Sequence, residues 1–298
     1  MPVKNPQREK IFDTARVLKE LHNGAKVEQG FRVLITGKGG AGKTTSTAIL
    51  ARLFARKGYK VLAVDEDPQM NLPFALGIPE TEAERIVPLT RNLDYIEEKV
   101  GARPGAGWGL MLRLNPEVDD VVDRFGIRAP DDIRLLVMGT VVQAATGCLC
   151  PENALLDAVV HYINLREKEV ILMDTQAGVE HFGRAIARGF KQAVIVTDAT
   201  FNSMQVALHA ARLARELGIP YRHLILNRIR SERDSQRARE QLQDKDADLF
   251  TSLTEIPFTE ELLEIEPDIS PIVEQGYAPE LLQKYLELTR LLEKYGET

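Results

Sequence analysis

The sequence predicts an α/β fold: a doubly wound, mostly parallel sheet with helices on both faces. Two observations support this prediction. Runs of apolar residues alternate with helical stretches between residues 31 and 230, and within each run most positions are apolar rather than alternately apolar and polar. Strands of that kind are buried on both faces, as in a parallel sheet covered by helices. The predicted strands are residues 32–36, 60–65, 134–139, 170–174, 193–197 and 223–227.

Two further segments flank this alternation. Residues 1–30 are charged, with Ile11, Ala15 and Leu18 at helical spacing, and they predict an N-terminal helical extension. Residues 31–298 then form one domain. Beyond residue 230 come a charged helical stretch (231–248), another apolar run (249–257) and a helical tail. The tail mixes Lys and Arg with Glu, and we expect it to pack on the core rather than on a membrane.

Composition restricts the possible partners and compartment. The chain has 298 residues, 44% of them hydrophobic and 28% charged, which is ordinary for a soluble globular protein. Its net charge of −6 disfavours adhesion to nucleic acid or an anionic membrane, so neither is an expected partner. No apolar run approaches the roughly 20 residues that span a bilayer. The only two cysteines, Cys148 and Cys150, form no disulfide framework, which favours a cytoplasmic, reducing location.

A phosphate-binding loop follows the first predicted strand. Residues 37–44 read Gly-Lys-Gly-Gly-Ala-Gly-Lys-Thr, which fits the pattern G-x-x-x-x-G-K-[ST] between a strand and a helix. The glycines let backbone N–H groups turn toward phosphates, and the following helix contributes the positive end of its dipole. Lys43 should reach the β- and γ-phosphates, and Thr44 should hold Mg²⁺. The predicted nucleotide-binding residues of this loop are Gly37, Lys38, Gly39, Gly40, Ala41, Gly42, Lys43, Thr44 and Thr45.

Two acids at predicted strand ends complete a phosphoryl-transfer site. Asp174 ends the run 170–174 and should orient Mg²⁺ through water. Asp67 follows the run 60–65 and should position the attacking water, also facing Mg²⁺ through water. A helix cap or a surface turn is the alternative for either acid. Parallel sheets bind ligands at the carboxyl ends of their strands, which favours the catalytic interpretation. The residues 175–178 then read as a switch that senses the γ-phosphate.

The base is predicted from the end of the strand 223–227. The Asn227 amide can pair with N6 and N7 of adenine. GTPases of similar fold carry N-K-x-D here, and its aspartate recognises guanine. In this sequence Arg228 and Arg230 replace that lysine and aspartate. ATP is therefore favoured over GTP.

The two cysteines form a C-x-C motif before a proline. Residues i and i+2 of an extended backbone point the same way, so Cys148 and Cys150 can face one metal ion. Two thiolates do not complete a tetrahedral site of four ligands, and a symmetric dimer would supply the other two. Ni²⁺ and Zn²⁺ both accept thiolates. The alternative is a pair of small buried hydrophobic residues.

These motifs together resemble a known family. Lys38, beside the first glycine, resembles the signature lysine of the deviant Walker A class that includes MinD, ParA and the nitrogenase iron protein. With Gly-Cys-Leu-Cys-Pro-Glu-Asn-Ala-Leu-Leu at 147–156 and residues 174–184, the chain resembles the carbon monoxide dehydrogenase maturation ATPases (CooC) and their acetyl-CoA synthase counterparts (AcsF). The resemblance covers about residues 31–260.

The resemblance implies a MinD-like P-loop ATPase that acts as an accessory protein. In that class, Lys38 would reach across a homodimer to the partner's phosphates and act in catalysis with Lys43, Asp67 and Asp174. The implied metal is nickel, bound at the dimer interface and delivered to a nickel–iron–sulfur client enzyme. Two features depart from the family pattern. Thirty residues precede the P-loop, and Gln176 stands where a glutamate is expected.

Other functional classes fit less well. A MinD- or ParA-like positioning or partitioning ATPase is the main alternative, but such a protein carries a basic DNA-binding face or a basic amphipathic tail. An electron-transferring iron protein needs cluster cysteines far apart in the sequence. A nickel GTPase is disfavoured by Arg230 and by scattered histidines, of which only His181 is a candidate additional ligand.

Overall fold

The structure is a computed structural model that describes part of the 298-residue chain. The described residues are 30–101, 118, 120–139, 155, 158, 159, 168–177, 189–242 and 248–296. The predicted N-terminal extension, Cys148, Cys150 and His181 lie outside them. The division into an extension and one domain therefore stays a prediction.

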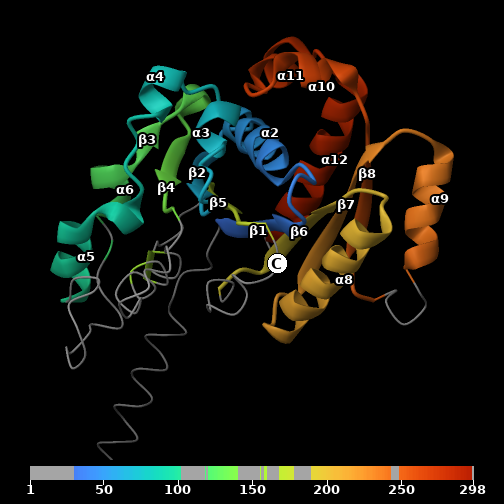
Figure 1. The fold of residues 1–298 in the computed structure, drawn as a ribbon, viewed down its shortest axis with the longest axis horizontal. Coiled ribbons are helices and arrows are strands. Elements are labelled where there is room, and N and C mark those ends of the chain that lie inside the picture. The colour runs from blue at the N-terminus through green and yellow to red at the C-terminus, as the bar shows by residue number, and fades with distance from the viewer. Residues whose placement is uncertain are drawn as a thin grey trace, which may run out of the picture.

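The described residues contain an eight-stranded sheet in the order β3-β4-β2-β5-β1-β6-β7-β8. All neighbouring strands run parallel except β3 and β4, which are antiparallel. The sheet extends in both directions from β1, as a doubly wound sheet does, and the predicted fold class is confirmed (Figure 1). The strands are β1 (Phe31–Gly37), β2 (Lys60–Asp65), β3 (Ile127–Arg128), β4 (Arg134–Val137), β5 (Glu169–Asp174), β6 (Gln192–Thr197), β7 (Tyr221–Ile229) and β8 (Ser252–Pro257).

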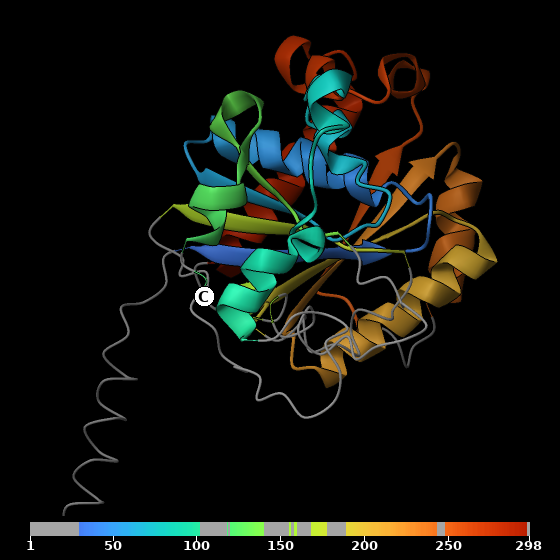
Figure 2. The same cartoon turned by 60° about the vertical axis from the view of Figure 1, so that its left-hand side comes forward.

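Helices cover both faces of this sheet, as Figure 2 shows for α2 and α8 on opposite sides. The α-helices are α2 (Lys43–Arg56), α3 (Leu72–Ala75), α4 (Glu80–Ala83), α5 (Leu93–Val100), α6 (Val121–Phe125), α8 (Phe201–Glu216), α9 (Glu232–Gln241), α10 (Glu260–Ile265), α11 (Ser270–Gln275) and α12 (Pro279–Gly296). Short 3₁₀ helices occupy Leu89–Arg91 and Pro130–Asp132.

Alternate residues of the strands enter two separate cores. In β1, Val33 and Ile35 belong to the core that also contains residues of α2 and α12, whereas Leu34 belongs to the core on the other face, which contains residues of α5 and α8. Successive side chains of a strand point to opposite faces, so a strand between two helical layers must be apolar throughout. This explains why the six predicted strands coincide with β1, β2 and β4–β7 within two residues at each end.

The C-terminal tail packs on the core, as the sequence indicated. Buried residues recur every three or four positions along α12, namely Leu281, Tyr285, Leu288 and Leu292. The Tyr285 hydroxyl lies 2.8 Å from Ser46 Oγ of α2. The helix therefore supports the element that begins at the phosphate-binding loop. Within the part of the chain that the structure describes, no helix is long and apolar enough to cross a membrane.

His223, a residue of β7, has an ionisable side chain that is fully buried. Its Nδ1 lies 2.8 Å from Ser252 Oγ of β8, and the ring of Tyr295 lies 5.5 Å away. Its Nε2 has no hydrogen-bond partner among the described residues. Burial, assisted by the charge of Arg222, lowers the pKa of His223 from 6.5 to about 4. The neutral imidazole is therefore the form that folding favours.

The free energy of unfolding should depend on pH because of His223. Between pH 6.5 and pH 4 the unfolded chain binds more protons than the folded chain, so lowering the pH across this window destabilises the fold. The loss should reach about 3 kcal/mol in the free energy of unfolding. We expect His223→Gln, which keeps a partner for Ser252 without ionising, to remove this component. Urea unfolding at several pH values measures it, and an equal pH dependence in both proteins would contradict the assignment.

Candidate functional site

The loop between β1 and α2 is drawn tightly against the sheet. Gly37 has φ +142°, and a Cβ there would lie 2.1 Å from the Val196 carbonyl oxygen of β6. Gly42 has φ +103°, and a Cβ there would lie 2.4 Å from Asn227 Nδ2 of β7. Both positions require glycine because of the backbone conformation and of the close approach. The loop therefore has a backbone in which successive N–H groups can face a bound anion.

Asn227 ties the end of β7 to this loop. Its Nδ2 donates a hydrogen bond to the Ala41 carbonyl oxygen at 2.8 Å, and its Oδ1 accepts one from the Arg228 backbone N–H at 3.0 Å. The side chain is buried. One amide hydrogen and one lone pair remain for a base. The pairing of Asn227 with adenine stays a prediction, and the structure adds its role in holding the loop.

Lys43 is the first residue of α2 and is almost fully buried. Its Nζ donates a hydrogen bond to the Lys38 carbonyl oxygen at 3.3 Å. Burial lowers the pKa of Lys43, and the carboxylates of Asp174 and Asp67 oppose that shift. An ammonium group held next to two acids and a loop of backbone N–H groups suits the polyphosphate of a nucleotide.

Asp174 lies at the end of β5 and is 1% exposed. Its Oδ2 accepts a hydrogen bond from Thr44 Oγ1 at 2.7 Å, while its Oδ1 is buried without a partner among the described residues. Burial raises the pKa of Asp174 to about 7, which Thr44 and Lys43 oppose. A buried carboxylate oxygen with no donor, beside a threonine hydroxyl, fits Mg²⁺, which prefers oxygen ligands and keeps several waters. Thr44 and Asp174 would hold the ion.

Asp65 is a functional residue that the sequence interpretation missed. It ends β2, is fully buried, and its two oxygens accept hydrogen bonds from the Asp67 N–H at 2.9 Å and the Leu72 N–H at 3.2 Å. Burial and the charge of Asp174 raise the pKa of Asp65 well above its usual range. Asp65 therefore shapes the loop that carries Asp67. The sequence signal that could have identified Asp65 is an acidic residue at the end of a buried strand.

A cavity of about 740 Å³ opens over these residues. Asp67, Gln176 and the loop residues Gly39, Gly40, Gly42, Lys43, Thr44 and Thr45 line it. Five other predicted residues are not among its lining residues, namely Gly37, Lys38, Ala41, Asp174 and Asn227, although Asp174 contacts the lining residue Thr44. The sequence did not predict the part of the wall formed by Phe74, Glu80, Glu266 and Pro267. The volume is in the range of pockets that hold small-molecule cofactors.

The predicted nickel site cannot be placed, because both cysteines lie outside the described residues. Within those residues, no group of three or more His, Cys, Asp or Glu side chains is arranged to hold a metal ion. The nickel prediction is therefore carried by the sequence alone.

Comparison with known proteins identifies related chains. Residues 33–272 match the family model CbiA, the CobQ/CobB/MinD/ParA nucleotide binding domain. An uncharacterized ATP-binding protein of Methanocaldococcus jannaschii is 41% identical over 67% of this chain and 76% of its own. The carbon monoxide dehydrogenase accessory protein CooC of Rhodospirillum rubrum is 37% identical over 76% of this chain and 83% of its own.

Solved structures share the fold at lower identity. The cell division ATPase MinD of Pyrococcus furiosus aligns with a TM-score of 0.60 at 23% identity, covering 88% of this chain and 99% of its own. An ATP complex of a McdA variant from Cyanothece aligns with a TM-score of 0.60 at 16% identity, covering 89% and 97%. The family match, the phosphate-binding loop and the Thr44–Asp174 pair agree: the chain belongs to the CobQ/CobB/MinD/ParA family of nucleotide-binding domains, and it is a P-loop ATPase similar to CooC.

Proposed function

We propose that this protein is an ATP-dependent accessory protein that binds nickel and helps to load it into a nickel–iron–sulfur enzyme, carbon monoxide dehydrogenase or acetyl-CoA synthase. The observation that carries the proposal is the C-x-C motif: a chain 37% identical to an accessory protein of carbon monoxide dehydrogenase has its only two cysteines at 148 and 150. Such a protein would work in the cytoplasm, where thiols stay reduced.

ATP would bind with its phosphates on the loop at residues 37–45. Lys43 would contact the β- and γ-phosphates, and bound Mg²⁺ would neutralise part of the developing charge. Thr44 and Asp174 would orient that ion. Asp67, which lines the same cavity and is held by Asp65, would position the attacking water. Hydrolysis would therefore depend on a loop whose shape is set by a buried carboxylate.

Binding of Mg²⁺ with nucleotide should also release a proton below pH 7. Burial raises the pKa of Asp174 to about 7, so part of this carboxyl is protonated under those conditions, whereas orienting the ion requires the carboxylate. We expect calorimetric titrations at about pH 6, in buffers of different ionisation enthalpy, to show proton release, and at about pH 8.5 to show almost none. Identical heats in all buffers at the lower pH would contradict this.

The homodimer is proposed because of Lys38. This lysine is half-buried in the loop, is not among the residues that line its own cavity, and is the residue that resembles the lysine acting across a dimer in this class. We expect Lys38→Ala to weaken dimerisation driven by an ATP analogue more than it weakens ATP binding. Sedimentation and calorimetry measure the two. Lys60, an 80% exposed lysine at the start of β2, is the matched control. Equal losses in Lys38→Ala would exclude a role across the interface.

The nickel site is tested by measuring mass and metal content together. If Cys148 and Cys150 of two chains form one four-thiolate site, wild type should hold one nickel per two chains, and Cys148→Ala should lose it. Dimer and metal should strengthen each other by the same free energy. A wild-type monomer holding a full equivalent of nickel would exclude the shared site. Activation of the client enzyme by wild type with ATP, and not by Cys148→Ala, tests the whole function.

A further inference from the structure

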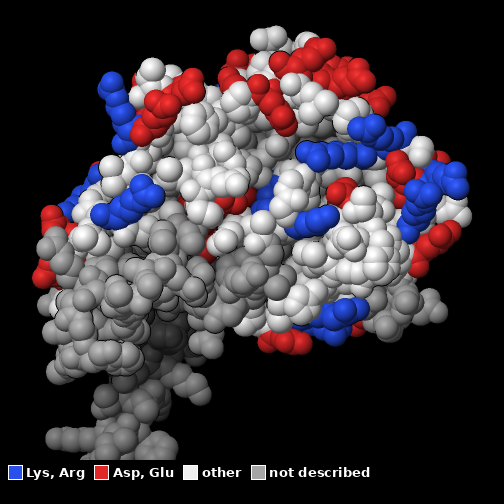
Figure 3. Space-filling model, viewed as in Figure 1, with Lys and Arg blue, Asp and Glu red and all other residues white. Residues whose placement is uncertain are grey.

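Part of the nucleotide cavity is formed by a segment far from the phosphate-binding loop in sequence. Glu266 and Pro267, in the connection between α10 and α11, line the cavity together with the loop residues. Acidic side chains gather over α10 and α11 (Figure 3). If the phosphates occupy the loop, the nucleoside half must extend toward other parts of the wall, and Glu266 and Pro267 are available to contact it.

This connecting segment has an internal polar scaffold. The Asp268 carboxylate accepts hydrogen bonds from the Ser270 N–H at 2.9 Å and from Ser270 Oγ at 2.5 Å. Asp268 follows Pro267 directly, and Ser270 begins α11. The conformation of the cavity wall at Glu266 and Pro267 therefore depends on the hydrogen bonds between Asp268 and Ser270, the first residue of α11.

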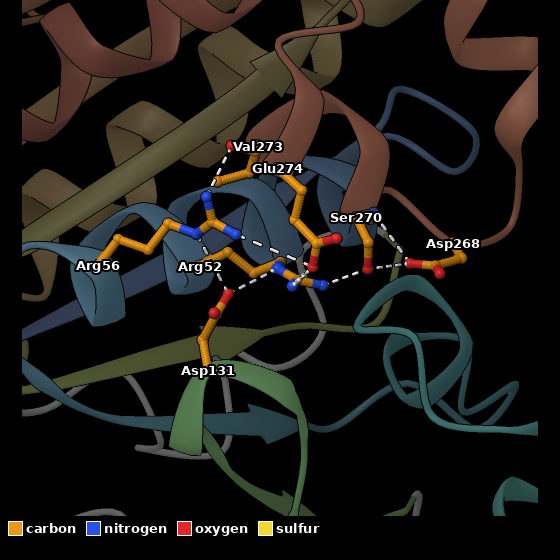
Figure 4. A network of polar contacts seen from close by, with 7 residues as sticks. All are labelled: Arg52, Arg56, Asp131, Asp268, Ser270, Val273 and Glu274. Carbon is orange, nitrogen blue, oxygen red and sulfur yellow. Dashed lines mark hydrogen bonds and ion pairs between the residues drawn. The ribbon is translucent and has the colours of Figure 1, made fainter.

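Arg52 connects α2 to this scaffold, as Figure 4 shows. It is 1% exposed, and each of its nitrogens has a partner. Nη1 donates to Ser270 Oγ, Nη2 donates to Glu274 at 2.5 Å, and Nε donates to Asp131 at 2.9 Å. A buried guanidinium is tolerated only when it is paired in this way. Arg52, a residue of α2, therefore contacts both the 3₁₀ helix Pro130–Asp132 and α11.

The helix that carries Arg52 begins at Lys43. At the usual rise of a helix, Arg52 lies about 14 Å along the axis from the phosphate-binding lysine. The same segment also touches α3, because the Ile269 N–H donates to the Ala75 carbonyl oxygen at 3.3 Å. Gly77, with φ +83°, leaves space for Asp268, whose carboxylate would lie 3.0 Å from a Cβ there. One short segment is thus held between α2 and α3.

We propose that Arg52 is a positioning residue for the nucleoside half of ATP. It does not line the cavity. Through its contact with Ser270, and through the hydrogen bonds of Ser270 to Asp268, Arg52 holds the segment that contains Glu266 and Pro267. This fixes the position of that segment relative to the phosphate-binding loop, which precedes α2. Glu266 can accept a hydrogen bond from a ribose hydroxyl or a base amine, and the ring of Pro267 offers an apolar surface. The inference rests on the placement of ATP in this cavity and is independent of nickel.

The test compares two ligands that share the phosphates and differ in the nucleoside. Affinities for ATP and for inorganic tripolyphosphate, each with Mg²⁺, are measured by calorimetry in wild type, Arg52→Lys and Ser270→Ala. Lys at position 52 keeps the charge but cannot reach three partners at once. Ser270→Ala removes only the hydroxyl between Arg52 and Asp268. We expect ATP to bind about ten-fold more weakly in Arg52→Lys and about three-fold more weakly in Ser270→Ala, with tripolyphosphate unchanged in both.

Arg56 supplies the matched control. It lies one turn further along α2 and shares Asp131 and Glu274 with Arg52, but its other contact is the Val273 carbonyl oxygen rather than Ser270. Arg56→Ala should leave both affinities unchanged. Unchanged ATP affinity in the folded Arg52→Lys and Ser270→Ala proteins, or equal weakening of the two ligands, would overturn the proposal. Wild-type protein that binds neither ligand would overturn the placement of ATP and this proposal with it, whereas the nickel measurement tests the proposed function separately.

Discussion

The Asp67→Ala variant should bind ATP with Mg²⁺ almost as well as wild type and hydrolyse it at least about 100-fold more slowly. Asp67 lines the cavity with Lys43 and Thr44, but it belongs to the loop after β2 rather than to the phosphate-binding loop. Its backbone N–H is held by the buried Asp65, which places the carboxylate independently of the phosphates. Removing that carboxylate should spare binding and impair activation of water.

Binding and turnover must be measured separately to test this. Calorimetry with a non-hydrolysable analogue gives affinity, and single-turnover release of phosphate gives the rate. Glu80→Ala is the matched control, because Glu80 lines the same cavity with the same charge but lies on α4. We expect it to hydrolyse ATP normally. A wild-type rate in Asp67→Ala, or an equal loss in Glu80→Ala, would show that Asp67 does not position the water.

The Arg52→Ala variant should lose about 3 kcal/mol of unfolding free energy. Breaking a buried ion pair costs roughly 3–5 kcal/mol because the remaining charges are left without a partner. The lower end of that range applies here, because the side chains of Asp131 and Glu274 are 23% and 44% exposed and can be partly rehydrated. Ser270 also loses a donor. The melting temperature should fall by on the order of 10 °C.

Urea unfolding of Arg52→Ala and Arg56→Ala measures this effect against a close control. Arg56 contacts two of the same carboxylates but is 38% exposed, and such surface pairs contribute about 1 kcal/mol or less. A small loss in Arg56→Ala with a large one in Arg52→Ala is the expected result. Comparable losses would mean that burial of the Arg52 guanidinium does not determine stability at this point.

The parts of the fold that the sequence predicted are those with a repeating apolar signal. β1 and β5 are buried on both faces, so nearly every position is apolar and the strand is evident from composition alone. β3 was missed because Ile127 and Arg128 are too few residues to show any periodicity, and their pairing with β4 is decided by tertiary contacts. The glycines and Lys43 of the phosphate-binding loop were predictable because their spacing is set by the geometry of a phosphate cradle.

Two of the missed residues, Arg52 and Glu266, lie next to segments that are distant in sequence. Arg52 looks like a solvent-facing position of a helix, because nothing near it in the chain indicates that Asp131 and Ser270 will surround it. Glu266 carries no motif, and it lies on the cavity only because α10 and α11 fold back toward α2. Asp65 was given no role because the sequence analysis assigned the catalytic acid at this strand end to Asp67, two positions away. Its role becomes visible only when the backbone hydrogen bonds of the loop are known.

The central position of β1 in the sheet has a consequence for synthesis on the ribosome. β1 is the first strand in the described chain, yet its two neighbours are β5 and β6, which begin at residues 169 and 192. At usual elongation rates of about 5–20 residues per second, the strand and the phosphate-binding loop after it wait on the order of ten seconds before either neighbour has been made. Nascent chains halted before residue 169 should therefore expose an unpaired apolar strand to chaperones and fail to bind nucleotide. Chains released after residue 257 have every strand of the described sheet available for pairing.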